Sequence, residues 1–446
     1  MPSKKTYVLF FALLFAVAPM VHAQFYNGMN MPFGKNRVQW GDFHWSYYNN
    51  EKFDVYFYQG GNDLALYAQA YAKDQIPRLE TRFNSQFKKK VQFIVFNSMG
   101  DFKQSNINLE EEENGNTGGI TKIIGSKVIL YFDGDYTHFE AQIREGIARL
   151  LFSQVMNGIS IGSQIRNSYR YDIPQWFRDG LAAFIAGNWD CHKEARLQRG
   201  IISGDYKKIN HLHDEDAQVA GYSFWNFIDE KYGSKSFNEI LTLAENTKSV
   251  RKALLYVTNK EYKKLVEEWY DYYKARYETV LVNQPNDVMA LKYKKYRTFT
   301  QPRISPNGKH IAYVSNDEGK IRLWLEDMQT GKREQLFKAG YHSDENIDTS
   351  FPLLAWHPNS NILSFIIEEK GKIQLYSLDI SSGKKASTYL FDFQKVSSFS
   401  YAHKSRKLVL AATRMGKPDI YVYNLFSNTH ITVCRLLLPI SMENCG

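Results

Sequence analysis

Ile304-Ser-Pro-Asn-Gly-Lys-His-Ile-Ala-Tyr-Val314 joins a tight turn to a β-rich run, and the chain repeats this arrangement twice. The copies read Trp356-His-Pro-Asn-Ser-Asn-Ile-Leu-Ser-Phe365 and Tyr401-Ala-His-Lys-Ser-Arg-Lys-Leu-Val-Leu410, at a spacing of roughly 50 residues. A second strand-like run follows each copy, at Ile321–Leu325, Ile373–Leu378 and Ile420–Leu425. Strands and turns repeated at this period are typical of propeller blades. The sequence therefore predicts about three propeller-type all-β blades over residues 290–430, in preference to an unrelated β-sandwich.

Three blades are too few for a closed ring, because propellers typically have four to eight. Either the chain is a fragment of a longer protein or a partner completes the ring. After Ser427–Ile431 the first strand of a further blade is predicted to start. Residues 431–446 then lose the blade pattern, and we expect an irregular tail there, from a truncated or frameshifted gene end.

The N-terminal residues 1–23 have the pattern of a cleaved signal peptide. Lys4-Lys5 precede an apolar run, Tyr7–Val21, and Val21-His22-Ala23 gives the small-x-small pattern that signal peptidase reads. The run is short for a membrane-spanning helix, which needs about 20 apolar residues. We therefore expect export to the periplasm, a mature chain beginning at Gln24 and no transmembrane segment after cleavage; an uncleaved anchor is the alternative.

Composition limits the classes of function. The chain has 446 residues, 43% hydrophobic and 23% charged, which is ordinary for a folded soluble protein. Its net charge of +9 allows contact with anionic envelope surfaces, but no basic stripe with interleaved aromatics predicts nucleic-acid binding. The three cysteines, Cys191, Cys434 and Cys445, are too sparse for a disulfide framework.

Residues 24–285 predict an α+β domain. The expected elements are strands at 52–58 and 91–96, a helix at 63–83, an acidic loop at 109–116, a hairpin over 120–132 and mostly helix over 137–277.

Two stretches of this domain carry a candidate chemical motif. One is His138-Phe-Glu-Ala-Gln-Ile-Arg-Glu-Gly-Ile-Ala-Arg-Leu-Leu-Phe152, and the other is Ile173-Pro-Gln-Trp-Phe-Arg-Asp-Gly-Leu-Ala-Ala-Phe184. Together they resemble the gluzincin metallopeptidases, specifically their peptidase MA-like domains. The turn from Ser305 to Lys309 resembles that of TolB-like propeller repeats. The resemblances imply a zincin-like domain followed by a partial TolB-like propeller, as in large envelope proteins of Gram-negative bacteria.

The resemblance does not carry over the zinc ligands. In gluzincins two His of an HExxH motif and a later Glu bind zinc, and the Glu of HExxH activates water. Arg144 and Ala148 stand at the two His positions, Glu145 matches the catalytic Glu, and Asp179 stands where the third ligand belongs. Ala has no ligand atom and Arg adds a permanent positive charge. We therefore predict no catalytic residue, no metal and no cofactor at these four positions.

The same residues have a structural interpretation. Glu140 and Arg144, and likewise Glu145 and Arg149, are four apart, which favours ion pairs along one helix. Alternatively, Arg144, Glu145 and Asp179 form a cluster in which Arg144 takes the place of the metal's charge and ties two helices together.

Two other stretches contain possible metal ligands. His211, His213, Asp214 and Asp216 form a His/Asp-rich run. Residues two apart share a face only in a strand, so a solvated loop is the favoured interpretation. Cys191-His192 is a single adjacent pair and predicts no site.

The sequence therefore predicts an exported, non-catalytic, peptidase-like scaffold that binds a protein or peptide of the cell envelope. The alternatives are a zinc-independent or otherwise unorthodox hydrolase, and an envelope glycan-binding module that stacks sugars on Trp side chains.

Overall fold

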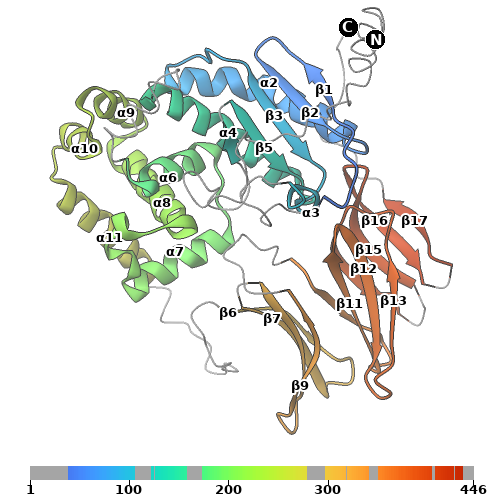
Figure 1. Cartoon of the computed structure of the whole chain (residues 1–446). Helices are drawn as coiled ribbons and strands as arrows, with labels where there is room; N and C mark the ends of the chain where they lie inside the picture. Colours follow the sequence, from blue (N-terminus) through green and yellow to red (C-terminus); the bar gives the residue numbers. More distant parts are fainter. Residues whose placement is uncertain are drawn as a thin grey trace, which may run out of the picture.

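The computed structural model describes residues 39–105, 122–124, 126–157, 173–278, 297–317, 319–340, 350–403, 407–425 and 427–434. Within these ranges a mixed α/β part with many helices precedes three antiparallel sheets (Figure 1). The predicted signal peptide, the acidic loop at 109–116 and tail residues 435–446 lie outside the described residues. No helix in the described part of the chain is both long and apolar enough to span a membrane.

The first part contains a five-stranded sheet of order β1-β2-β3-β5-β4. Its strands are β1 (Ser46–Asn49), β2 (Phe53–Phe57), β3 (Val91–Phe96), β4 (Lys122–Ile124) and β5 (Lys127–Tyr131). The three central strands β2, β3 and β5 are parallel, whereas β1 and β4 are antiparallel edge strands. The predicted strands at 52–58 and 91–96 and the predicted hairpin are confirmed.

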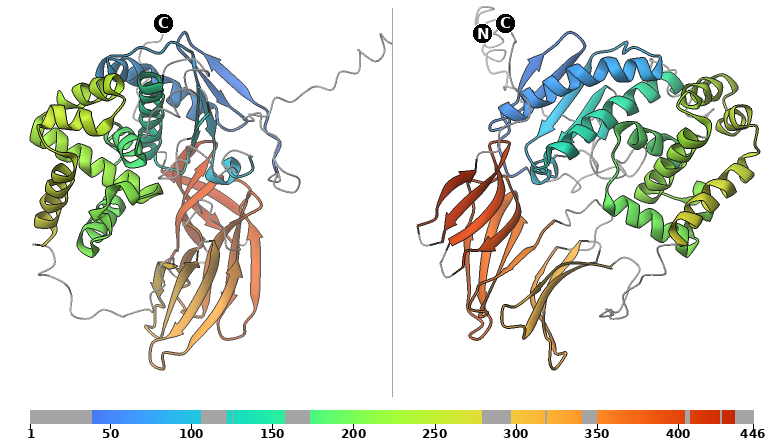
Figure 2. Two further views of the ribbon diagram at one scale, coloured as in Figure 1. Left: turned by 60° about the vertical axis from the view of Figure 1, so that its left-hand side comes forward. Right: turned by 180° about the vertical axis from the view of Figure 1, so that it is seen from behind.

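Helices follow and cover this sheet. They are α2 (Asn62–Phe83), α3 (Met99–Phe102), α4 (Tyr136–Asn157), α6 (Gln175–Ala186), α7 (Cys191–Ser203), α8 (Asp214–Tyr232), α9 (Ser236–Thr247), α10 (Val250–Thr258) and α11 (Tyr262–Glu278), with 3₁₀ turns η1 (Asp205–Lys207) and η2 (Ile209–His211) between α7 and α8. The long helices α2 and α4 run across one face of the sheet, and the remaining long helices gather at their far end (Figure 2). The predicted helix at 63–83 is confirmed.

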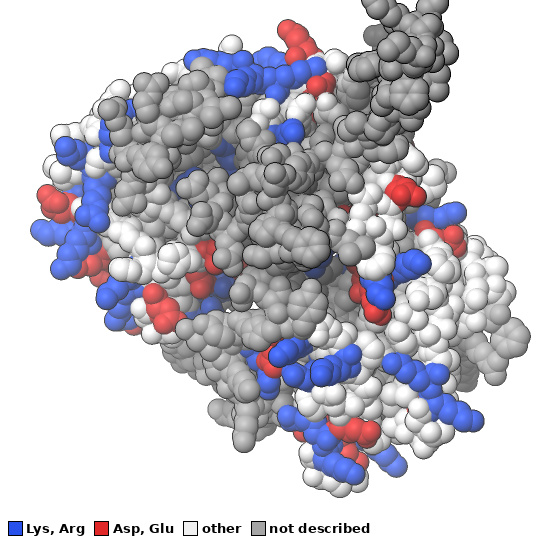
Figure 3. All heavy atoms as spheres, viewed as in Figure 1, with Lys and Arg blue, Asp and Glu red and all other residues white. Residues whose placement is uncertain are grey.

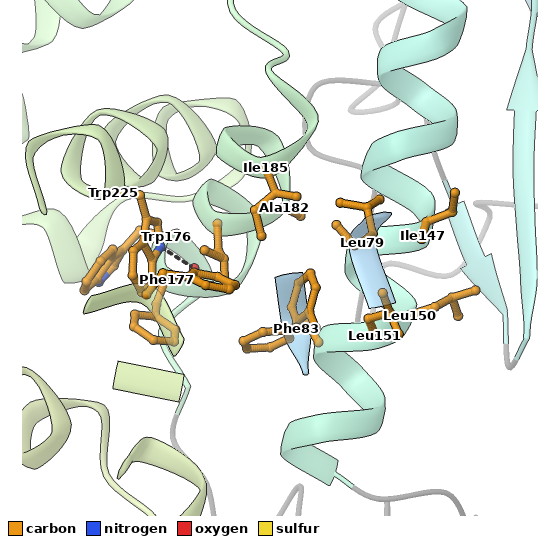
Figure 4. Packing of buried hydrophobic residues seen from close by; sticks show 14 of the residues in the cluster. Leu79, Phe83, Ile147, Leu150, Leu151, Trp176, Phe177, Ala182, Ile185 and Trp225 are labelled. Atoms are coloured by element: carbon orange, nitrogen blue, oxygen red, sulfur yellow. Dashed lines mark hydrogen bonds between the residues drawn. The ribbon is translucent and has the colours of Figure 1, made fainter. Parts of the chain in front are cut away.

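One hydrophobic cluster joins the sheet to all these long helices. Leu79 of α2 and Leu151 of α4 pack toward Phe177 of α6, and Trp225 of α8 packs behind that ring (Figure 4). The Trp225 indole donates a hydrogen bond to the Phe177 carbonyl oxygen at 3.1 Å, so its polar atom is satisfied inside the core. The core therefore fixes α4, α6 and α8 relative to one another.

The second part is three four-stranded sheets. The first blade is β6 (Arg297–Ile304), β7 (His310–Asp317), β8 (Lys320–Asp327) and β9 (Arg333–Ala339); the second is β10 (Leu353–Trp356), β11 (Ile362–Glu369), β12 (Lys372–Asp379) and β13 (Lys385–Tyr389); the third is β14 (Lys395–Tyr401), β15 (Lys407–Arg414), β16 (Lys417–Asn424) and β17 (Thr429–Cys434). Each is an antiparallel meander in chain order. The predicted blade-like sheets are confirmed.

The end of the third blade differs from the sequence prediction. The first strand of a further blade was expected after Ser427–Ile431, but β17 (Thr429–Cys434) pairs with β16 and completes the third blade. The prediction was wrong because strand pairing is non-local, and a short β-rich run does not show which neighbour it joins. Strand β17 therefore runs to Cys434, into the segment expected to be irregular, with one register shift opposite Ile420 and Tyr421.

Candidate functional site

The candidate site lies where α4 and α6 face one another. Glu145 and Arg149 of α4 are one helical turn apart, and Asp179 of α6 lies across from them. Helix α6 in turn packs closely on α8, because Gly180 and Gly221 leave no side chain between the two backbones. This close packing brings Gln218 of α8 to Glu145.

Arg149 bridges the two carboxylates. Its Nε and Nη2 donate to Oε1 of Glu145 at 2.9 and 2.7 Å, and its Nη1 donates to Oδ1 of Asp179 at 2.8 Å. Only 8% of Arg149, 3% of Glu145 and none of Asp179 is exposed. Arg178, at the surface end of the cluster, donates a further bond to Asp179 at 3.0 Å. Two arginines thus balance two carboxylates in a site removed from water.

The two carboxylates hold Arg149 in its ionised form. Burial alone lowers the pKa of Arg149, but the carboxylates of Asp179 and Glu145 outweigh burial and raise that pKa above its usual value. Removing one member of such a buried pair leaves an uncompensated charge, which is strongly destabilising. The cluster therefore acts as a fixed ionic cross-link between α4 and α6.

Amide side chains complete the surroundings of Glu145. Asn188 donates to its Oε2 at 3.3 Å, and Gln218 donates to its Oε1 at 3.1 Å. Lys193, itself 7% exposed, donates to Oδ1 of Asn188 at 2.7 Å. Both oxygens of Glu145 thus accept hydrogen bonds from protein groups. We name Glu145, Arg149, Asp179, Asn188 and Gln218 the buried ionic network.

Arg144 lies outside the buried ionic network. Its Nε donates to the carbonyl oxygen of Ala186 at 2.7 Å, its Nη1 bonds the Tyr71 hydroxyl, and it lies 3.8 Å from Glu140. The expectation that Arg144 pairs with Glu145 and Asp179 was wrong, because Arg149 takes that place. Both predicted i,i+4 pairs, Glu140–Arg144 and Glu145–Arg149, are confirmed.

The donor set does not fit a gluzincin zinc site. Ala148 is fully buried in the core and has no ligand atom, and Arg144 offers only N–H donors. Glu145 and Asp179 are both occupied by Arg149. A catalytic zinc site normally has three protein ligands with an open position. Across the described ranges, no three His, Cys, Asp or Glu side chains gather closely enough to hold a metal.

The His/Asp-rich run has a structural role. His211 ends the 3₁₀ turn η2, and His213 precedes the first residue of α8. Asp216 accepts hydrogen bonds from Arg196 at 2.9 Å and from the Tyr206 hydroxyl at 2.8 Å, which ties α8 to α7 and η1. Cys191 is exposed at the start of α7 and makes no disulfide.

Sequence reasoning missed the central residue of the network. The pairing of Glu145 with Arg149 could be read from their spacing, but the contact of Arg149 with Asp179 could not. That contact depends on how α4 and α6 are rotated against each other. A signal was nevertheless available, because Arg149 follows Ala148 and precedes Leu150 and Leu151 in an apolar stretch where an arginine needs a buried partner.

Basic and acidic side chains are interspersed over the described surface on the face shown in Figure 3, and they do not gather into one basic stripe. This distribution gives no support to nucleic-acid binding.

The C-terminal part matches a known family. The family model described as the TolB beta propeller domain matches residues 254–435. The match begins inside α10, whereas the strands of the first blade begin at Arg297. Residues 254–435 therefore include a TolB-like β-propeller domain, and its blades occupy the strand-rich part of that range.

Individual relatives cover less of the chain. Dipeptidyl-peptidase 5 of Porphyromonas gingivalis is 28% identical over 90 residues, which are 19% of this chain and 12% of that protein. TolB from Acinetobacter baumannii is 20% identical. The match covers 30% of this chain and 32% of the TolB chain, with a TM-score of 0.26. The propeller domain of the trilobed protease from Pyrococcus furiosus is 15% identical. That match covers 32% of this chain and 46% of the propeller domain's chain, with a TM-score of 0.25. The chain thus spans a minor part of each of these relatives.

Proposed function

We propose that this chain, whose C-terminal part includes a TolB-like β-propeller domain, is a non-catalytic, peptidase-like scaffold that binds an envelope protein or peptide. The observation that carries the proposal is the buried ionic network between α4 and α6. In the gluzincin resemblance, α4 corresponds to the helix with the catalytic Glu and α6 to the helix with the third zinc ligand. In this chain both carboxylates are bound by Arg149.

The hydrogen bonds of Glu145 oppose a catalytic role. A general base must come within hydrogen-bond reach of the proton that it takes, and only 3% of Glu145 is exposed. One oxygen of Glu145 accepts from Arg149 and Gln218, and the other accepts from Asn188. These contacts support a role in stability rather than in proton transfer.

Contacts between the two parts support a scaffold that works as one unit. The Tyr136 hydroxyl donates to the Gly416 carbonyl oxygen at 3.2 Å, and Lys417 pairs with Asp63 at the start of α2. These contacts place the β15–β16 hairpin of the third blade against the N-terminal part.

The glycan-binding alternative has less support. Trp176, Trp225, Trp269 and Trp356 are each at most 8% exposed, so they offer no face to a sugar. Trp40 is 55% exposed, but the Lys370 ammonium lies 5.8 Å from its ring centroid. The proposal accordingly names a protein or peptide partner.

The proposal is tested by digesting a broad peptide library with the purified chain and sequencing the products by mass spectrometry. We expect no new peptide ends from the wild type, from Glu145→Gln or from the matched control Glu140→Gln on the same helix. Cleavage that disappears in Glu145→Gln and persists in Glu140→Gln would support the hydrolase alternative and overturn the proposal.

Export is a separate part of the proposal, and it rests on the pattern of residues 1–23. Intact-mass measurement of the protein from the periplasmic fraction should give a chain beginning at Gln24. Recovery of the protein only in the cytoplasmic fraction with Met1 retained would contradict export.

A further inference from the structure

We infer that an aromatic cage at the junction of the first and second blades binds a trimethylammonium group, whose place the side chain of Lys385 takes in the free protein. The cage is formed by Phe337 of β9, Phe365 of β11 and Tyr376 of β12. Its strands are separate from the helices that carry the buried ionic network.

The strand register brings the three rings and Lys385 together. Phe365 and Tyr376 lie opposite one another on β11 and β12. Tyr376 also lies opposite Ser387 of β13, and Lys385 is two residues from Ser387, so it shares the face of the sheet that carries Tyr376. Phe337 comes from the first blade, and its ring centroid is 5.0 Å from that of Phe365. Two blades therefore contribute to one site.

The ammonium group of Lys385 lies against all three rings. Its Nζ is 4.4 Å from the ring centroid of Tyr376, 4.7 Å from that of Phe337 and 5.4 Å from that of Phe365. A cation within about 6 Å of a ring centroid is attracted by the negative face of the ring. The cage is therefore a cation site, and in this structure its occupant is a side chain of the same protein.

The rings are held in place by contacts that do not involve Lys385. Phe365 is fully buried in the apolar cluster between the first and second blades, and Phe337 and Tyr376 pack against that cluster. The rings of Phe365 and Tyr376 stack with their centroids 5.0 Å apart and 12° between their planes. The Tyr376 hydroxyl donates a hydrogen bond to Oε1 of Gln374 at 2.9 Å. The cage therefore keeps its walls when the lysine side chain moves away.

The cage suits a cation that has no hydrogen-bond donor. A lysine ammonium carries three N–H donors. Among the residues that the structure describes, none pairs with the Lys385 ammonium or accepts a hydrogen bond from it. Burial lowers the pKa of Lys385, because the ammonium loses part of its hydration. A trimethylammonium group has no N–H donor to satisfy, and aromatic rings are the groups that recognise such quaternary ammonium ligands.

Lys385 can leave the cage without a change of fold. The residue is exposed, and its flexible stem allows the ammonium to swing into water. A ligand has to compete with this tethered lysine, so its apparent affinity is reduced by the fraction of molecules in which the cage is open. Removal of the lysine side chain should therefore tighten binding of the ligand.

The test is a ligand-observed NMR titration of the full chain with choline chloride. We expect choline to bind the wild type, and to bind Lys385→Ala about tenfold more tightly. The control Lys207→Ala removes a lysine that lies over a single ring, 5.9 Å from the centroid of Tyr270, and should leave the affinity unchanged. Adding Tyr376→Leu to Lys385→Ala should abolish the gain. The neutral isostere of choline, in which a tert-butyl group replaces the trimethylammonium, should bind both proteins much more weakly.

Three results would overturn the inference: a wild-type chain that does not bind choline, a Lys385→Ala variant that binds it no more tightly than the wild type, or equal binding of the neutral isostere. A lysine that only joined the two blades would give Lys385→Ala a lower melting temperature without tighter binding of choline.

Sedimentation with phosphatidylcholine vesicles distinguishes the two sources of such a group. Retention that Tyr376→Leu abolishes would assign the trimethylammonium to a lipid headgroup, and the lack of such retention would assign it to a free small molecule. Both results keep the inference, which the choline titration decides.

Discussion

Arg149 is the residue on which the α4–α6 contact depends. It is almost fully buried and forms ion pairs with two buried carboxylates. We expect Arg149→Met, which keeps the length and removes the charge, to lower the free energy of unfolding by roughly 3 to 5 kcal/mol, because Glu145 loses its counter-ion and Asp179 keeps only Arg178. Urea denaturation at neutral pH measures the change.

Arg144→Met is the matched control on the same helix. Its side chain is 24% exposed and bonds a carbonyl oxygen and a tyrosine hydroxyl outside the network. The Arg144→Met substitution should lower the free energy of unfolding by about 1 kcal/mol. An equal loss of stability in the two variants would show that the buried ionic network is not what holds α4 to α6.

Asp317 at the end of β7 makes the first blade sensitive to acid. Arg297 donates two hydrogen bonds to it at 2.6 Å each, and Arg322 a third at 3.0 Å. The bond from Arg297, above all, lowers the pKa of Asp317 to about 2. Because the folded pKa lies below the unfolded value of about 3.9, the pair stabilises the fold above pH ~4 and loses this effect as the pH falls toward ~2.

Asp317→Asn should therefore lower the urea midpoint at pH 7, and its deficit against the wild type should shrink between pH 4 and pH 2. Asp271→Asn, at an exposed residue of α11, serves as the control. A deficit of the same size at all pH values would contradict the assignment of the shifted pKa to Asp317.

At the scale of elements, the α6–α8 contact depends on two glycines. A Cβ on Gly221 would overlap the Trp176 carbonyl oxygen, and a Cβ on Gly180 would overlap the backbone of Gly221. Because backbone atoms cannot rotate out of the way, Gly221→Ala should push α6 and α8 apart. We expect it to lower the free energy of unfolding by about 1 to 3 kcal/mol. Thermal unfolding measures this loss of stability as a lower melting temperature.

Gly41→Ala is the control for the removal of glycine flexibility, since its Cβ would make only ordinary van der Waals contacts, the nearest at 3.5 Å. It should leave the melting temperature nearly unchanged. If Gly221→Ala proved as harmless as Gly41→Ala, α6 and α8 would not be in the close contact described.

Some elements could be predicted from the sequence and others could not. Helix α2, the strands β2 and β3 and the repeating blades were predictable, because their signals are local periodicity and turn chemistry. The placement of β17 and the partner of Asp179 were not, because each depends on which distant element packs alongside. The buried network was therefore predicted as a cluster but assigned the wrong arginine.

At the scale of the whole molecule, one interface could not be read from the sequence at all. The β15–β16 hairpin reaches α2, where a Cβ on Gly416 would lie 3.3 Å from the Leu64 side chain. Gly416 has φ of +73°, a conformation that glycine adopts most easily. Neither the helical pattern of α2 nor the β-rich pattern of β15 and β16 indicates that these segments are in contact. The contact gives the N-terminal part a fixed place against the third blade, as the proposed scaffold role requires.

In our proposal, the ionic cross-link between α4 and α6 stands where a gluzincin would hold zinc. The most direct test is elemental analysis of the purified chain after dialysis against micromolar zinc, beside a Glu145→Gln, Asp179→Asn double variant as the control. We expect far less than one zinc per chain at this site, and therefore no difference between the two proteins. One zinc per wild-type chain that is absent from the double variant would contradict the account.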